Sequence, residues 1–467
     1  MVELWASLTA NMSKKNLITG SALLVMLLLA VVFSFGGDSD AVRVAQTAPS
    51  TQEVADNTEL DVSRLETQTN TPTTLSVTNL RVQGQDQEAA VLAQRQITSG
   101  EQQSQIGGGG ACTIQVNAGG NVAGAVRQAS AGDVVCFAPG NYGHLLINGK
   151  NGQPDNPIEF TAPDGGAVFS LGGVEAGPST SAVSVDNSSH IVVDGLEATN
   201  SMRGIGVNGS SQVEVLNCTI SGTGQEGFHV RDASTQVRVA GCDISDTGNR
   251  QGVDTTQSLR FSVFGELVYV GNGAKAGDTT NNVTVENNVL HDNGNATSEA
   301  VNVKSSTHDV TVRNNHIFNI DSWCEAAIRA NVSNNLTIVG NVIHDITASG
   351  TGGDGNRCNS AIGIRFDSNN AVVENNVVFR AGNTGILAEE GSGGVIRNNT
   401  LFSNGTDFAN QGSAQASNNL TSDGSNGKQV AASAFVGPID GSADTGAGPG
   451  SGFELQTGVG GFSLSQN

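Results

Sequence analysis

Side chains of the kinds used in acid–base chemistry recur at equivalent places in short apolar segments of the chain. They lie one position before or after an apolar residue of the segment, or four positions before it. The first two places hold His229, Tyr269, Asn302, Arg231, Lys304, Arg329 and Arg365. The third place holds Glu226, Glu266 and Glu299. Because the neighbours of an inward residue in a strand point outward, we expect all of these side chains on one exposed face.

This combination suits lytic β-elimination of a uronate-containing polysaccharide. The reaction needs a cation that neutralises the sugar carboxylate, a base that removes the adjacent proton, and an acid for the leaving oxygen. We expect the base and the acid among Lys304, Tyr269 and His229, with Lys304 as the base because cationic neighbours would lower its pKa. The expected substrate-binding residues are Arg231, Asn302, Arg329 and Arg365. A calcium ion, if one takes part, would be held by Glu226, Glu266 and Glu299.

The same side chains also fit three roles that do not involve elimination. A glycoside hydrolase would use two of the glutamates as its carboxyl pair. A non-catalytic glycan-binding or adhesion protein would use the face for binding alone, although 2 Trp and 2 Tyr in the whole chain argue against a neutral-sugar binder. The charged residues also fit plain ion pairs, since stacked glutamates repel one another and a neighbouring arginine or lysine relieves the repulsion.

The elements that carry these residues are imperfect repeats between Val213 and Leu401. Each unit ends in a short apolar strand and a corner whose second residue is Cys218, Cys242, Asn288, Asn315, Asn341, Asn376 or Asn399. Units of roughly two dozen residues with inserted loops are typical of a solenoid. Apolar and polar residues alternate in each unit, which predicts strands. We expect the inward residues Val207, Val230, Val270, Val303 and Ile364 to stack in the core about 4.8 Å apart, and the asparagines to bond one another at the corner.

Two segments carry a family resemblance. GDVVCFAPGNY (Gly132 to Tyr142) and NPIEFTAP (Asn156 to Pro163) resemble the start of right-handed parallel β-helix proteins, and the resemblance covers roughly Ala111 to Leu420. It implies an all-β right-handed parallel β-helix, a solenoid of about ten coils. Several exported members of this fold are pectate, alginate or chondroitin lyases, so the resemblance also implies an acidic polysaccharide as partner. The chain lacks the calcium-binding aspartate cluster of those lyases, the NTD, DD and GHG segments of the polygalacturonate hydrolases, and the DPHD motif of the alginate epimerases.

The ends of the chain differ in composition from the repeats. Residues 17–36 are apolar and follow Lys14 and Lys15, which predicts a signal anchor or a signal peptide after a cytoplasmic segment, 1–16. Residues 37–110 are polar without periodicity and predict a disordered linker. The β-helix is expected over 111–420 and a low-complexity tail over 421–467. The repeats are therefore expected outside the cytoplasm, either membrane-anchored through the N-terminal segment or secreted.

Charge and cysteine content narrow the partners and the compartment. A net charge of −22 argues against binding nucleic acid or anionic lipid through bulk attraction. The six cysteines form three sequence-neighbouring pairs: Cys112 with Cys136, Cys218 with Cys242, and Cys324 with Cys358. Export permits disulfides, and the second pair occupies one corner position in adjacent coils, where the thiols are bonded or merely stacked. No CxxC cluster indicates zinc.

Overall fold

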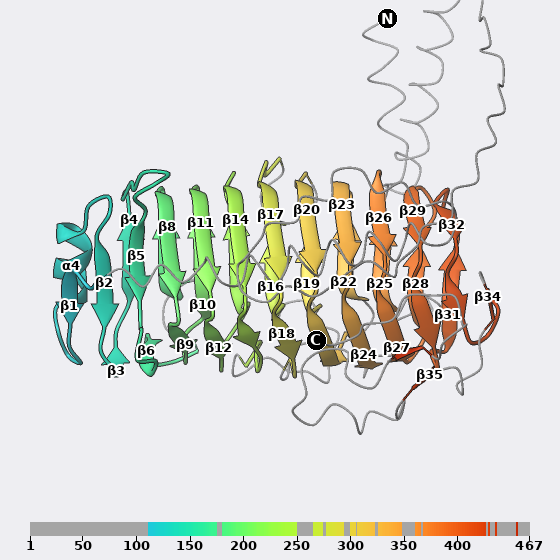
Figure 1. Cartoon of the computed structure of the whole chain (residues 1–467), viewed down its shortest axis with the longest axis horizontal. Helices are drawn as coiled ribbons and strands as arrows, with labels where there is room; N and C mark the ends of the chain where they lie inside the picture. Colours follow the sequence, from blue (N-terminus) through green and yellow to red (C-terminus); the bar gives the residue numbers. More distant parts are fainter. Residues whose placement is uncertain are drawn as a thin grey trace, which may run out of the picture. The chain divides into compact units, whose positions relative to one another are not determined.

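The computed structural model describes residues 111–425 apart from segments 175–179, 250–264, 274–276, 294–298, 305, 323–325, 348–359 and 366–367, and three short strands beyond residue 427. Parallel strands form three long sheets that share one stacking direction (Figure 1). Successive strands of the chain belong to different sheets, and each strand pairs with its equivalent in the next coil. This topology is a parallel β-helix.

The first sheet has 12 strands. They are β1 (Ile114–Val116), β2 (Val134–Phe137), β5 (Ile158–Thr161), β8 (Ser189–Asp194), β11 (Ser211–Leu216), β14 (Thr235–Ala240), β17 (Asn281–Glu286), β20 (His308–Arg313), β23 (Asn334–Val339), β26 (Ala371–Glu374), β29 (Gly394–Arg397) and β32 (Gln415–Ser417).

The second sheet, the ten-stranded sheet, has 10 strands. They are β4 (Leu145–Asn148), β7 (Ser181–Asp186), β10 (Arg203–Asn208), β13 (Phe228–Arg231), β16 (Val268–Val270), β19 (Val301–Val303), β22 (Ala326–Asn331), β25 (Ser360–Arg365), β28 (Thr384–Ala388) and β31 (Thr406–Asn410). Its strand number agrees with the expected coil number.

The third sheet again has 12 strands. They are β3 (Gly140–Tyr142), β6 (Ala167–Ser170), β9 (Glu197–Thr199), β12 (Thr219–Ser221), β15 (Asp243–Ile244), β18 (Val289–His291), β21 (His316–Asp321), β24 (Val342–Thr347), β27 (Val377–Ala381), β30 (Thr400–Phe402), β33 (Leu420–Thr421) and β34 (Lys428–Gln429). A separate antiparallel pair consists of β35 (Phe435–Val436) and β36 (Glu454–Leu455).

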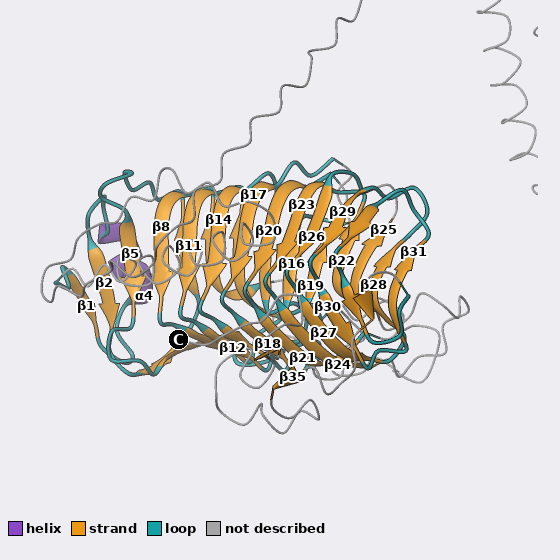
Figure 2. Cartoon of the chain, turned by 45° about the vertical axis from the view of Figure 1, so that its right-hand side comes forward, coloured by secondary structure: helices purple, strands orange, loops and turns teal. Residues whose placement is uncertain are grey.

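The core is a set of apolar columns, as the alternation predicts. Val207, Val230, Val270 and Val303 are fully buried and Ile364 is 2% exposed. Phenylalanines of the first coils, including Phe137 and Phe169, fill the N-terminal end of the same cluster. Figure 2 shows the strands of all three sheets enclosing this narrow interior. Burial of the columns removes a continuous apolar surface from water and holds the coils in register.

The asparagine-rich corners meet two requirements of the backbone, a residue that tolerates a left-handed conformation and a buried hydrogen-bond acceptor. The first corner residue is left-handed, with φ of 49° at Asn217 and 55° at Asn287, a conformation that asparagine tolerates better than most residues. The second is buried, and its Oδ1 accepts both the backbone N–H and the side-chain N–H of the corner residue in the preceding coil, as Asn315 does for Asn288. The same bonds repeat through Asn341, Asn376, Asn399 and Asn419, which confirms the predicted ladder.

Two features of the N-terminal end complete the fold. The helix α4 (Val122–Gln128), which the repeat pattern does not predict, is capped by the Asn121 side chain and buries Ala125 and Val126. A disulfide joins Cys112 and Cys136, as expected.

Cys218 and Cys242 are free, buried thiols at the corner position, so this pair is stacked rather than bonded. Cys324 and Cys358 lie outside the described residues. Among the described residues no helix has the length and apolar character to cross a bilayer, and the predicted membrane segment, 17–36, lies outside them.

Candidate functional site

The ten-stranded sheet brings the predicted residues together in a row that crosses its coils. His229 on β13 pairs with Tyr269 on β16, Tyr269 pairs with Asn302 on β19, and Asn302 pairs with Arg329 on β22. Neighbours in the row are therefore one strand spacing apart, about 4.8 Å. The repeat pattern predicts Arg329 in the row of Lys304, and this is wrong, because Ala330 rather than Ile328 occupies the place of Val303.

A second row holds the three glutamates. Each of the three glutamates lies two residues before a strand of the ten-stranded sheet. The backbone N–H of Gly227 donates to the carbonyl of Glu266, and that of Leu267 to the carbonyl of Glu299, so the glutamates occupy equivalent positions in successive coils. Their exposed fractions are only 2–3%. His229, Tyr269 and Asn302 are equally buried, at 3%, 5% and 0%. The expected open face is thus a packed one. The His229 and Tyr269 rings lie against each other, and Lys304 lies over the Tyr269 ring.

Each glutamate of this row has a cation beside it. Arg203 on β10 bonds Glu226, and Arg329 Nη1 donates to Glu299 Oε1 at 2.7 Å. Lys304 Nζ lies 3.9 Å from Glu266 Oε1. Sequence reasoning missed Arg203 because it stands one residue before Gly204, where the repeat pattern of its coil begins. The glutamates thus have cationic neighbours, as the ion-pair interpretation expects, and together they form one buried polar cluster. The partners of Glu226 and Glu299 are Arg203 and Arg329, whereas Arg231 and Arg365 pair with Asp232 and Glu389.

Burial and charge pull the pKa values of the three carboxyl groups apart. Burial alone would raise the pKa of Glu226, but the positive charges of His229 and Arg203 and the Arg203 hydrogen bond outweigh it and lower this pKa. Since His229 is neutral at neutral pH, Arg203 supplies the charge there. Burial also acts to raise the pKa of Glu299, but Arg329 and Lys304 outweigh it and lower this pKa. At Glu266 burial and the two flanking glutamates dominate over Lys304 and raise the pKa to about 8.

His229 and Tyr269 are both held in defined neutral forms. Burial lowers the pKa of His229 to about 4. Its Nε2–H donates to the carbonyl of Gly271 at 3.0 Å, and its Nδ1 is an acceptor that has no hydrogen-bond partner in the described part of the chain. Burial and the charge of Glu266 raise the pKa of Tyr269, which keeps its hydroxyl protonated. The Tyr269 hydroxyl accepts from the N–H of Gly273 at 3.1 Å, and Lys304 Nζ lies 4.8 Å from the centre of its ring.

The neighbours of Lys304 differ from those expected. Its close ionisable neighbour is the carboxyl group of Glu266 rather than a cation, so the cationic neighbours expected to lower its pKa are not found. Its side chain is 17% exposed. Lys304 therefore reaches from the solvent edge to the centre of the buried cluster.

The remaining predicted arginines lie farther from the cluster centre. Arg231 Nε donates to Asn208 Oδ1 at 2.7 Å and lies 3.4 Å from Asp232, with a quarter of its side chain exposed. Arg365 lies on β25, two strands beyond Lys304, where its Nε is 2.6 Å from Glu389 Oε1 and both side chains are buried. The structure places Arg231 at the rim of the cluster and does not bring Arg365 to it.

The fit of the glutamates to a metal ion can be tested on their geometry. In the described part of the chain no group of three or more His, Cys, Asp or Glu side chains is arranged to hold a metal. Glu226, Glu266 and Glu299 instead face Arg203, Lys304 and Arg329. Cations already occupy the positions around these carboxyl groups, so the arrangement does not suit calcium.

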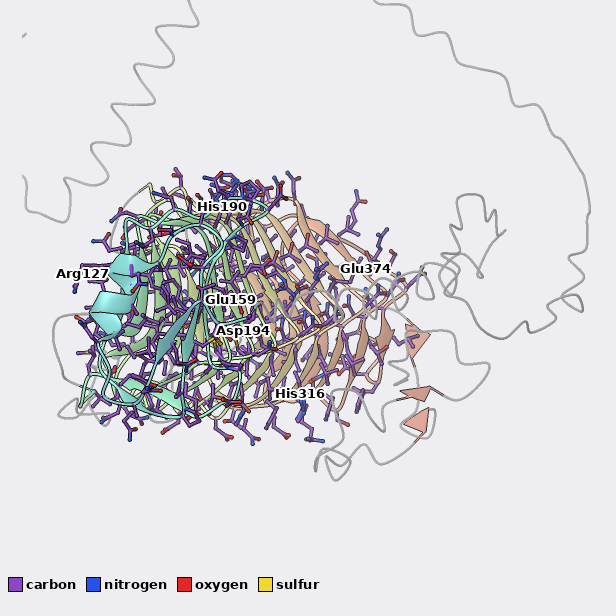
Figure 3. All side chains as sticks on the ribbon, turned by 60° about the vertical axis from the view of Figure 1, so that its left-hand side comes forward. Arg127, Glu159, His190, Asp194, His316 and Glu374 are labelled. Atoms are coloured by element: carbon purple, nitrogen blue, oxygen red, sulfur yellow. A yellow bond between two sulfur atoms is a disulfide. The ribbon has the colours of Figure 1, made fainter. Side chains whose placement is uncertain are left out.

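Several titratable groups lie away from this cluster. His291, His316 and His344 belong to the third sheet and His308 to the first. A cleft of about 780 Å³ is lined by His291 and by acidic residues including Asp246, Asp292 and Asp321. On the first sheet, Glu159 lies near Asp194 (Figure 3), and burial together with this charge raises the pKa of Glu159 to about 7.

Comparisons with known proteins agree with the fold. The family described as right handed beta helix region matches residues 174–322. Among solved structures, the chain is similar to an alginate lyase from Paenibacillus sp. str. FPU-7, with 17% identity, 65% of this chain and 99% of that chain covered, and a TM-score of 0.49.

The chain is also similar to the pectate lyase Pel9A, with 17% identity, coverage of 75% of this chain and 91% of that one, and a TM-score of 0.49. A third similar structure is PfbA, a surface adhesin of Streptococcus pneumoniae, with 12% identity, coverage of 64% and 86%, and a TM-score of 0.37. No curated protein matches the chain.

Proposed function

We propose that this right-handed parallel β-helix protein is an exported, carbohydrate-active protein that cleaves a uronate-containing polysaccharide by β-elimination. The observation that carries the proposal is the cluster on the ten-stranded sheet, in which Lys304, Tyr269 and Arg329 surround one buried carboxyl row. It combines a partly exposed amine, a protonated phenol and a guanidinium within neighbouring coils.

Each part of the reaction has a group in this cluster. Arg329, with Arg231 at the rim, neutralises the sugar carboxylate and so acidifies the proton on the adjacent carbon. The Lys304 amine takes that proton, and the electron pair of the C–H bond forms the new C=C bond as the glycosidic C–O bond breaks. Tyr269 donates its proton to the leaving oxygen, and its raised pKa keeps that proton available. His229 packs at 4.5 Å between ring centres and holds the Tyr269 ring in place.

The charge of the cluster supports an acidic substrate. The whole chain carries −22, yet at neutral pH only two glutamates of the cluster are ionised, because the pKa of Glu266 is raised to about 8. They face three cations, Arg203, Lys304 and Arg329. Arg231 adds a fourth cation at the rim, beside Asp232. An anionic polymer thus meets cations here on a protein that otherwise repels it. The disulfide between Cys112 and Cys136 supports export, because disulfides persist in oxidising compartments.

The test is absorbance near 235 nm, where unsaturated uronate ends absorb, with alginate, pectate and glycosaminoglycans as substrates. We expect a rise with one polymer, a loss of at least about a hundredfold in Lys304→Ala, and no change in the control Lys150→Ala, whose amine bonds a backbone carbonyl outside the cluster. A folded Lys304→Ala protein with wild-type rate removes Lys304 as the base. Full activity after exhaustive chelation removes calcium from the reaction.

A second candidate function is glycoside hydrolysis, and the glutamate row favours it. Adjacent and alternate members are about 4.8 Å and about 9.6 Å apart by strand spacing, which brackets the carboxyl separations used by glycosidases. The high pKa of Glu266 beside two ionised carboxylates fits an acid in that role. New reducing ends without a 235 nm rise, lost in Glu266→Gln, would favour hydrolysis. A folded protein that binds polymer without cleaving it would favour a glycan-binding solenoid.

A further inference from the structure

We infer that Asn302 selects sugars that carry a free hydroxyl group beside the bound carboxylate. The inference rests on the proposed uronate polymer as ligand, but not on its cleavage. The cations alone would not give the site this preference. A sugar whose ring hydroxyl carries an O-acetyl ester would bind poorly.

The orientation of the Asn302 side chain is fixed from one end only. Its Nδ2 donates to Glu266 Oε1 at 3.2 Å, which directs Oδ1 away from that carboxyl group. Oδ1 is buried and has no hydrogen-bond partner among the residues that the structure describes, and the whole residue is 0% exposed. A buried acceptor without a donor destabilises the fold, and such groups in folded proteins commonly mark a functional role.

The position of Asn302 places this acceptor where a bound sugar would lie. The register sets Tyr269 and Arg329 on either side of it, facing the same side of the sheet. Lys304 follows directly after β19, and its Nζ lies 4.8 Å from the centre of the Tyr269 ring on that side. Lys304 and Arg329 keep 17% and 15% of their side chains exposed. Both side chains are long, so a polymer carboxylate that binds Arg329 and shifts the Lys304 side chain would reach Asn302.

The chemistry of the acceptor defines the ligand group. Once Arg329 holds the carboxylate, a hydroxyl on the same or the next sugar ring comes within reach of Oδ1. A hydroxyl donates a proton to it, whereas an O-acetyl group has no proton to donate and adds bulk. Sites built to bond a substrate hydroxyl reject analogues that lack it far more strongly than apolar pockets reject size changes. His229 Nδ1, also without a hydrogen-bond partner, offers a second acceptor two strands away in the same row.

The experiment compares binding of polygalacturonate and alginate with binding of the same polymers after chemical O-acetylation, using titration calorimetry on the full chain. We expect the wild-type protein to prefer the unmodified polymer by at least about tenfold, the value of one satisfied acceptor. Asn302→Ala should lower this ratio to near one, mainly by weakening binding of the unmodified polymer. Asn302→Asp keeps an acceptor oxygen and should retain most of the ratio, which also covers a failure of the alanine variant to fold.

The control is Asn410→Ala, an exposed asparagine at the far end of the same sheet, which should keep the wild-type ratio. An unchanged ratio in Asn302→Ala overturns the inference while cleavage, measured separately, leaves the lyase proposal standing. A changed ratio without any cleavage supports the inference and overturns the lyase. No binding to any of the polymers overturns both.

Discussion

The buried ion pair between Arg203 and Glu226 offers the sharpest test of how the cluster is held. Their side chains are 8% and 3% exposed, and removing one partner of such a pair leaves a charge in a poorly solvated place. Measured losses for this change are about 3–5 kcal/mol. We expect Arg203→Met, which keeps much of the side-chain volume, to lower the free energy of unfolding by that amount at pH 7 in urea titrations followed by circular dichroism.

The pH dependence of this loss follows from the pKa of Glu226. In the wild-type protein this pKa lies below its ordinary value of 4.5, so the pair stabilises the fold above about pH 4.5 and loses its effect as pH falls through the folded-state pKa. In Arg203→Met, burial without the arginine raises the folded-state pKa, so this protein loses stability as pH rises above 4.5. The difference between the two proteins should therefore be largest at neutral pH and shrink toward pH 4.

Two further variants make the test specific. Arg397 also pairs with a glutamate, Glu374, but half of its side chain is exposed, so Arg397→Met should cost less than about 1 kcal/mol. Adding Glu226→Gln to Arg203→Met should recover much of the loss, because the unpaired charge is gone. A cost below about 1 kcal/mol for Arg203→Met at pH 7, or the same cost at pH 4, would refute the reasoning.

Three other predictions concern stability, each measured as a free energy of unfolding. Asn315→Ala leaves the backbone N–H of Asn288 without its acceptor and should cost about 2–4 kcal/mol; a cost near zero would mean that the ladder does not hold the corner. Glu159→Gln should stabilise the fold by about 1 kcal/mol at pH 8, after allowance for solvent screening, and have no effect at pH 4, because a raised pKa of about 7 makes the ionised form unfavourable; equal effects at both pH values would contradict this. Reduction of the Cys112–Cys136 disulfide, whose cysteines are 24 residues apart, should cost about 3 kcal/mol, and an unchanged urea midpoint would show that the crosslink is unimportant.

The sequence predicts the fold well because the repeats specify it several times over. Val207 and Val230 are inward by simple alternation, and the paired corner asparagines answer two local backbone needs that recur from coil to coil. Helix α4 could not be foreseen in the same way, since its seven residues include a glycine and occur once.

The site is only partly predictable for a physical reason. Alternation indicates that His229 and Tyr269 share a face, but not that they are buried, because burial depends on how long charged side chains of adjacent coils fold over them. The partner of Glu226 is Arg203, one coil earlier, and the partner of Glu299 is Arg329, one coil later. The sequence alone does not indicate whether a glutamate pairs with a cation of the preceding coil or of the following coil.

Helix α4 has a consequence for how molecules of this protein meet. A stack of parallel strands ends in unpaired N–H and C=O groups, and such ends can extend by joining the end of another stack. The first strands of two sheets, β1 and β4, have α4 as a neighbour, and its buried Ala125 and Val126 are part of the core cluster (Figure 1). The helix therefore covers edges to which the strands of a second molecule could otherwise pair. At this end of the solenoid, α4 therefore opposes end-to-end pairing of two molecules through β1 and β4.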